Sequence, residues 1–128
     1  MAEKGIDVSR WQGTVDWSRV KSAGIRFAIL KATQRGNRTE IKFETNYAGC
    51  RTNGIPVGAY HYVYAGNTQE AKAEAQAVVS ALRGKDISCG LWLDMEDDCI
   101  RDLGKQNLSL IIKKEADIIR RAGYGVGI

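Results

Sequence analysis

Two carboxylates stand two residues apart at the end of an apolar stretch, at Asp94 and Glu96. The preceding residues 91–93, Leu-Trp-Leu, are typical of a buried strand. Because side chains alternate across a strand, both carboxylates would point to one side, with their Cα atoms roughly 6.5 Å apart. Glycosidases use carboxyl pairs about 5–5.5 Å apart for retention and about 6.5–9.5 Å apart for inversion. The spacing therefore indicates a general acid beside a stabiliser of positive charge, with a solvated acidic turn as the alternative.

The rest of the chain alternates between strand-like and helix-like segments. Glycines at 24, 54, 84 and 123 each end a helical pattern and precede an apolar run, as expected where a chain leaves a helix. The expected strands cover about 4–8, 25–32, 56–64, 88–95 and 124 onward, and the expected helices cover about 16–23, 43–52, 67–82 and 108–119. This alternation predicts an α/β fold with a parallel sheet and right-handed crossovers, either an open doubly wound sheet or a barrel.

In both architectures, functional residues gather at the carboxyl ends of the strands. The polar and aromatic residues at or near those ends are Asp7, Lys31, Tyr60, Tyr62, Asp94 and Glu96. His61 has the opposite parity to its tyrosine neighbours, so we expect it to face the helices as a structural histidine. Trp92 shares the parity of Asp94, so we expect it to point inward and pack in the core.

Composition limits the possible functions. The chain of 128 residues is 44% hydrophobic and 27% charged, as in an ordinary globular domain, and its net charge of +4 favours an anionic partner. Bacterial wall polymers fit this charge. Nucleic acid fits less well, because the basic residues are scattered and form no recognition motif.

No apolar run is long enough for a membrane span and no signal-peptide pattern begins the chain. With one histidine, three cysteines at no metal-like spacing and no nucleotide-binding motif, we expect no metal and no cofactor.

Five stretches resemble, in the same order, glycoside hydrolase family 25, the bacterial and phage N-acetylmuramidases. They are GIDVSRWQG at 5–13, VDW at 15–17 with GIRFAILKAT at 24–33, FETNY at 43–47, GIPVGAYHY at 54–62 and LDME at 93–96. The resemblance covers essentially the whole chain. It implies a TIM-like (β/α) barrel with a groove at the strand ends. It also implies cleavage of the β-1,4 bond between N-acetylmuramic acid and N-acetylglucosamine, and hence action outside the cell or in the cell wall.

The resemblance also implies roles for individual carboxylates. Glu96 matches the acid/base glutamate of the family, and Asp94 matches the aspartate thought to support attack by the substrate's own 2-acetamido group. Asp7 matches the aspartate that ends the first strand. Carboxylates close to Glu96 would raise its pKa, because they disfavour a second negative charge, and so would keep it protonated near neutral pH.

Four other residues are candidates for binding the sugar chain of peptidoglycan. The rings of Trp11, Tyr60 and Tyr62 suit the apolar faces of sugar rings, with packing inside the barrel as the alternative for each. Lys31 would either pair with a carboxylate of the site or cap the end of its strand. In the segment that follows, Gln34 replaces a glutamate common in the family and an expected aspartate near position 41 is missing, which puts substrate contacts there in doubt.

Chain length raises a question about the barrel. A (β/α) barrel has eight strands and typically about 250 residues, so residues 1–128 would form about four and a half units, the N-terminal portion of the domain. A half-barrel has exposed sheet edges and an exposed apolar face, which favours self-association, most simply as a dimer. The alternative to an active enzyme is an inactive half-barrel that self-associates or binds wall glycan without catalysis.

Overall fold

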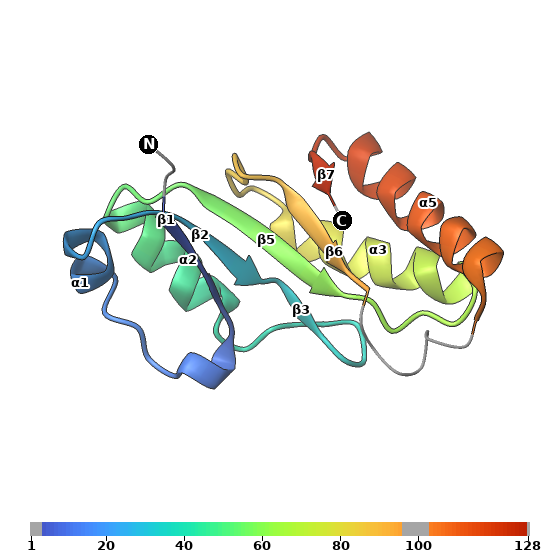
Figure 1. The fold of residues 1–128 in the computed structure, drawn as a ribbon, viewed down its shortest axis with the longest axis horizontal. Coiled ribbons are helices and arrows are strands. Elements are labelled where there is room, and N and C mark those ends of the chain that lie inside the picture. Colours follow the sequence, from blue (N-terminus) through green and yellow to red (C-terminus); the bar gives the residue numbers. More distant parts are fainter. Residues whose placement is uncertain (1–3, 96–102, 128) are drawn as a thin grey trace.

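The computed structural model describes residues 4–95 and 103–127 (Figure 1). Its elements, in chain order, are β1 (Lys4–Val8), η1 (Arg10–Gln12), α1 (Trp17–Ser22), β2 (Ile25–Lys31), β3 (Thr33–Gln34), β4 (Arg38–Thr39), α2 (Phe43–Thr52), β5 (Val57–Tyr62), α3 (Thr68–Leu82), β6 (Leu91–Asp94), α5 (Lys105–Arg121) and β7 (Val126–Gly127). The expected alternation of strands and helices is confirmed. No helix in these two ranges combines the length and the apolar character that crossing a membrane requires.

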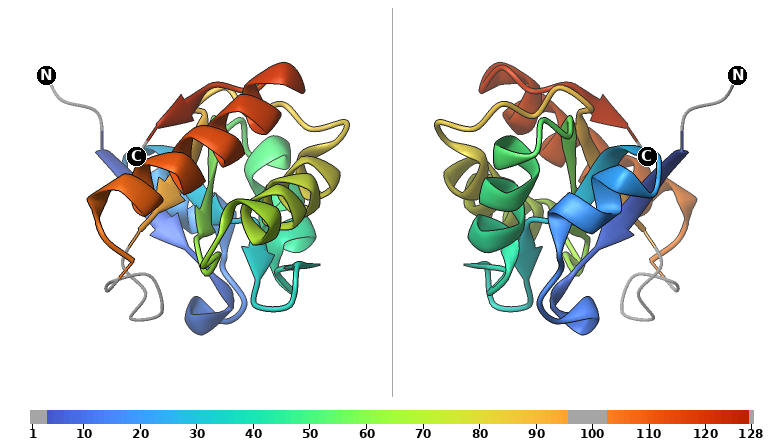
Figure 2. Two further views of the ribbon diagram at one scale, coloured as in Figure 1. Left: turned by 90° about the vertical axis from the view of Figure 1, so that its right-hand side faces the viewer. Right: turned by 90° about the vertical axis from the view of Figure 1, so that its left-hand side faces the viewer.

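The main sheet has five parallel strands in the order β1-β2-β5-β6-β7, which is also their order along the chain. The helices that connect them all lie on one face of this sheet (Figures 1 and 2). A doubly wound sheet would reverse its strand order and carry helices on both faces. The topology is therefore that of consecutive barrel units, which decides between the two architectures that the sequence pattern allows.

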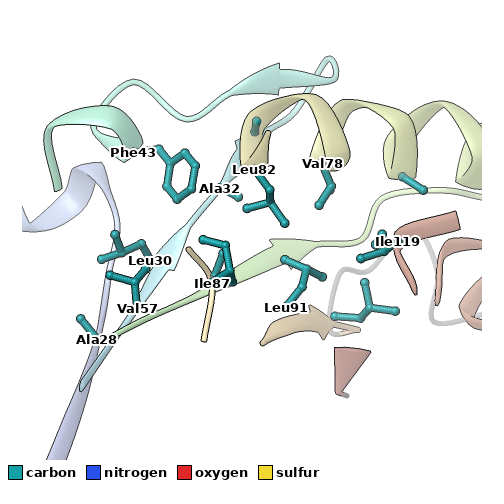
Figure 3. Close-up of a cluster of buried hydrophobic side chains, with 14 of the residues drawn as sticks. Ala28, Leu30, Ala32, Phe43, Val57, Val78, Leu82, Ile87, Leu91 and Ile119 are labelled. Carbon is teal, nitrogen blue, oxygen red and sulfur yellow. The ribbon is translucent and has the colours of Figure 1, made fainter. Parts of the chain in front are cut away.

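The hydrophobic core lies between the sheet and its helices. Leu30, Val57 and Leu91 point from neighbouring strands toward the helices, and all three are almost fully buried. Side chains from α2, α3 and α5 cover them, among them Phe43 and Leu82 (Figure 3). Alternation along each strand thus sends one set of side chains into this core and the other set to the opposite, inner face of the sheet.

Local signals set where two helices begin. The side chain of Asp16 accepts a hydrogen bond from the backbone N–H of Arg19 (3.2 Å) and caps α1. Asn67 accepts from the N–H of Glu70 (2.8 Å) at the start of α3, while the Glu70 side chain accepts from the N–H of Gly66 (2.8 Å). Each capping residue is the first residue of the helix range expected from the sequence, and each cap depends only on residues within about one helical turn.

A short hairpin, formed by β3 and β4, was not expected from the sequence. Thr33 pairs with Thr39 and Gln34 with Arg38. Of the three turn residues, 35–37, Gly36 and Asn37 have positive φ angles, of 88° and 58°. A Gly-Asn pair suits such a tight turn, because both residues tolerate the left-handed conformation. The hairpin brings residues 33–39 beside the carboxyl end of the sheet.

The inner face of the sheet shows where one prediction was wrong. Trp92 does share the face of Asp94, but it is 44% exposed rather than packed in the core. Its indole lies against the backbone of Gly127, so close that a Cβ atom on residue 127 would be 2.5 Å from the ring. The indole Nε1 donates a hydrogen bond to the carbonyl oxygen of Cys89 (3.0 Å). The helices that connect the strands lie on the other face of the sheet, so they do not bury this side of the indole (Figure 2).

Candidate active site

Three polar side chains meet at the carboxyl end of the sheet on its inner face. In the strand register, Asp7 lies beside Ile29, Tyr60 lies beside Trp92, and Asp94 lies beside Tyr62. Parallel neighbours in register point to the same side, so β1, β5 and β6 present Asp7, Tyr60 and Asp94 on one face of the sheet. They line an open hollow of about 530 Å³, whose wall consists of Asp7, Ile29, Tyr60, Trp92, Leu93 and Asp94. Its volume lies within the range of about 300–1,000 Å³ found for small-molecule sites.

The pKa of the Tyr60 phenol reflects the burial and the negative charge of this hollow. Burial, and then the negative charges of Asp7, Asp94 and Glu40, raise the pKa of the phenol above its ordinary value, against the opposing effect of a hydrogen bond with Ser9. The phenol is therefore protonated at neutral pH. It offers a hydrogen-bond donor between carboxylates, which can only accept.

Asp94 is the last residue of β6, and its carbonyl oxygen accepts a hydrogen bond from the N–H of Val63 (2.9 Å). The strand thus ends one residue earlier than the sequence pattern indicates. Glu96, with the expected spacing to Asp94, lies outside the described residues. Within those residues the hollow contains two of the three expected catalytic carboxylates, Asp7 and Asp94.

The other expected binding residues, Trp11, Lys31 and Tyr62, are not among the residues that line the hollow. Trp11 is 78% exposed on η1, where the guanidinium of Arg10 lies 5.2 Å from its ring centre. Lys31 ends β2, and its Nζ lies 5.9 Å from the ring centre of Tyr62. The structure therefore gives Lys31 an aromatic contact, an arrangement that the sequence did not suggest.

Glu40 is a residue of this region that was not anticipated. It is 2% exposed, and its carboxylate accepts from the backbone N–H of Arg10 (2.9 Å) and from that of Lys42 (2.7 Å). It thereby fixes the η1 turn, which presents Trp11, against the segment before α2. The contact with Lys42 is local, but the contact with Arg10 joins segments distant in the sequence, and no periodic pattern indicates it.

Behind the sheet, His61 faces the helices as expected and is 3% exposed. Its Nε2 lies 3.2 Å from a carboxylate oxygen of Glu74 on α3 and 3.1 Å from one of Glu115 on α5, and its Nδ1 lies 2.7 Å from the hydroxyl of Thr33. The Glu115 contact is short but poorly aligned for a hydrogen bond, so it is mainly electrostatic. We call these three ionisable residues the His61 cluster.

Among the described residues, the His61 cluster is also a group of donors close enough to share a metal ion, with ligand atoms within 4.8 Å of one another. Both imidazole nitrogens already have protein partners, so the arrangement of the cluster is explained without a metal ion. Burial disfavours the charge on His61, but contacts with Glu115 and Glu74 outweigh it and raise the histidine pKa to about 9. Burial raises the pKa of Glu115 to about 7. His61 is therefore protonated at neutral pH, and its positive charge balances negative charge on the two buried carboxylates.

The strand order and the position of the hollow define a domain of the (β/α)-barrel class. Residues 6–128 match the sequence model of Glycosyl hydrolases family 25. The chain belongs to this family. Its fold is similar to that of the catalytic domain of endolysin ply40 from the Listeria monocytogenes bacteriophage P40, with a TM-score of 0.86 and 26% identity over 99% of this chain and 62% of that one.

Two curated relatives extend the comparison. The autolytic lysozyme of Clostridium acetobutylicum is 28% identical over 96% of this chain and 36% of its own length. The N,O-diacetylmuramidase of a Chalaropsis species is 33% identical over 74% of this chain and 47% of its own length. The chain thus spans less than half the length of these relatives.

Proposed function

We propose that this chain contributes to a peptidoglycan hydrolase that cleaves the β-1,4 bond between N-acetylmuramic acid and N-acetylglucosamine. The observation that carries the proposal is the open hollow at the strand ends, where Asp7 and Asp94 flank Tyr60. Family membership and relatives named as lysozymes and muramidases support it. The substrate would be the glycan strand of peptidoglycan, and the place of action would be the cell wall or the extracellular side of a bacterium.

The proposed mechanism assigns one role to each carboxylate. Glu96 donates its proton to the glycosidic oxygen while the bond from that oxygen to C1 of N-acetylmuramic acid breaks. The oxygen of the substrate's 2-acetamido group forms a bond to C1, and Asp94 orients this group and stabilises its developing positive charge. Glu96 then takes a proton from water, whose oxygen adds to C1 and releases the acetamido group. Asp7 adds to the negative field, and Tyr60 donates a hydrogen bond to the bound sugar.

A wall-clearing assay tests this proposal. The purified protein is expected to lower the turbidity of a suspension of Gram-positive cell walls, because cutting the glycan strands solubilises the wall. Heat-denatured protein at the same concentration is the control. A non-catalytic glycan-binding half-barrel, the alternative function, would sediment with the walls and leave their turbidity unchanged.

We also propose that the chain by itself self-associates, most simply as a dimer, through the exposed edges of its half-barrel sheet. The specific observation is the exposed indole of Trp92, beside a sheet whose outer strands, β1 and β7, each pair on one side only within the described residues. Unpaired strand edges and exposed apolar surface favour association. Light scattering at micromolar concentration is expected to give at least the mass of a dimer, and a monodisperse monomer would refute this.

A further inference from the structure

A chain of contacts joins four segments near the carboxyl end of the sheet: η1, the end of β2, the β3–β4 hairpin and the end of β5. Arg10 lies against the ring of Trp11 and donates from Nη1 to Oε1 of Gln34 (3.1 Å). Next to Gln34, the guanidinium of Arg35 lies 4.4 Å from the ring centre of Tyr64. We call this surface the basic-aromatic ridge; its residues are Arg10, Trp11, Lys31, Gln34, Arg35, Tyr62 and Tyr64.

The ridge continues directly into the proposed active site. The rings of Tyr64 and Tyr62 are 5.0 Å apart, and Tyr62 also contacts Lys31. Tyr62 lies beside Asp94 in the strand register, and Lys31 lies beside Tyr60. A polymer bound in the hollow and leaving it at this end of the sheet would therefore pass over the ridge.

The charge of the ridge is positive where the hollow is negative. Residues 33–39 of the hairpin contain two arginines and no acidic residue, while Glu40, which follows them, is buried. The Gln34 amide oxygen accepts from Arg10, so a neutral side chain joins these two segments. The ring contacts hold the planes of Arg10 and Arg35, which lowers the entropy lost when a ligand binds.

We propose that the basic-aromatic ridge is a subsite for the carboxylates of the glycan strand, so that the chain selects an acidic sugar polymer over a neutral one. This inference rests on the proposed function. In peptidoglycan every second sugar has a lactyl ether with a carboxyl group, which is free or linked to peptide, whereas chitin has the same β-1,4 backbone without it. Guanidinium groups bind carboxylates through charge-assisted hydrogen bonds, and the exposed ring of Trp11 offers a flat face to a sugar.

Binding to two matched sugars tests the subsite without depending on catalysis. The probes are a peptide-free tetrasaccharide of alternating N-acetylglucosamine and N-acetylmuramic acid, and N-acetylchitotetraose. Affinities are measured by calorimetry with the Glu96→Gln protein, which prevents turnover. We expect the acidic tetrasaccharide to bind about tenfold more tightly, as one or two charge-assisted hydrogen bonds would provide, and this preference to shrink in high salt.

Variants locate the preference. Arg35→Gln and Arg10→Gln, each in the Glu96→Gln background, are expected to remove most of it and to leave the affinity for N-acetylchitotetraose within about twofold. The matched control is Arg19→Gln on α1, because Arg19 is an exposed arginine that is not part of the ridge. Thermal unfolding of each variant verifies that it is folded.

Three results would overturn the inference. Equal affinity for both sugars would refute the subsite while leaving the proposed function intact. Absence of binding to either sugar would refute the glycan site itself. A glycerol-phosphate polymer that binds more tightly than the tetrasaccharide, with this binding lost in Arg35→Gln, would show that the ridge recognises phosphate and not the carboxylates of the glycan.

Discussion

Replacement of Glu96 by glutamine is expected to slow wall clearing by about 100-fold to 10,000-fold, the usual contribution of a general acid. The amide has nearly the shape of the carboxyl group but cannot transfer a proton to the departing glycosidic oxygen. The effect should appear in kcat, while the affinity for the glycan changes little, because proton transfer occurs only in the transition state. Rates of reducing-sugar release over a range of substrate concentrations separate the two quantities.

Glu44→Gln is the matched control for this substitution. Glu44 lies on α2, on the helix side of the sheet, with a 66% exposed side chain that pairs with Lys85. Its replacement removes the same charge from the chain without touching the hollow, so activity within about twofold of the wild type is expected. If Glu96→Gln kept more than half of the wild-type rate, the assignment of the proton donor would be wrong.

Replacement of His61 by alanine is expected to lower the free energy of unfolding by about 3–5 kcal/mol, the usual effect of removing one partner from a buried ion pair. The change would leave Glu74 and Glu115, which are 7% and 0% exposed, without their positive partner. Urea unfolding at pH 7 measures the loss. Arg51→Ala is the control. It breaks an exposed pair with Asp86, and a change within about 1 kcal/mol is expected.

The His61 cluster also predicts how stability depends on pH. Both folded-state pKa values are raised, that of His61 from 6.5 to about 9 and that of Glu115 from 4.5 to about 7. The folded protein therefore binds more protons than the unfolded chain within these windows, so its stability falls as pH rises. The Glu115 contribution is lost between about pH 4.5 and 7, and the His61 contribution between about pH 6.5 and 9.

Unfolding free energies at pH 5, 7 and 9 test this account. The wild type is expected to be most stable at pH 5 and least stable at pH 9. In Glu115→Gln, the decline between pH 5 and pH 7 should largely disappear, because the amide does not titrate. A wild type whose stability rose from pH 5 to pH 9 would show that the cluster does not hold protons as proposed.

The sequence predicted those features that depend on neighbouring residues. Caps at Asp16 and Asn67 involve one helical turn, and strand parity correctly placed His61 toward the helices and Trp92 toward the inner face. The exposed fraction of Trp92 could not be predicted from strand parity, because parity gives the face to which a side chain points but not how much of it other residues bury.

Features that depend on distant segments were missed. Glu40 contacts the backbone of Arg10, and the partners of His61 come from two different helices, so neither arrangement follows from local periodicity. The hairpin was missed for another reason. Gly36 and Asn37 are a local signal for a turn, but the patterns of long strands and helices do not include it. The same turn contributes Arg35 to the basic-aromatic ridge.

The identity of the new reducing ends in digested peptidoglycan tests the proposed activity most directly. Purified walls are incubated with the protein, reduced with borohydride and hydrolysed, and the reduced amino sugars are identified by mass spectrometry. Cleavage after N-acetylmuramic acid predicts reduced muramic acid in the wild-type digest and none above background with Glu96→Gln. Reduced glucosamine in its place, or solubilised walls without new reducing ends, would contradict the assignment of this chain as part of a muramidase.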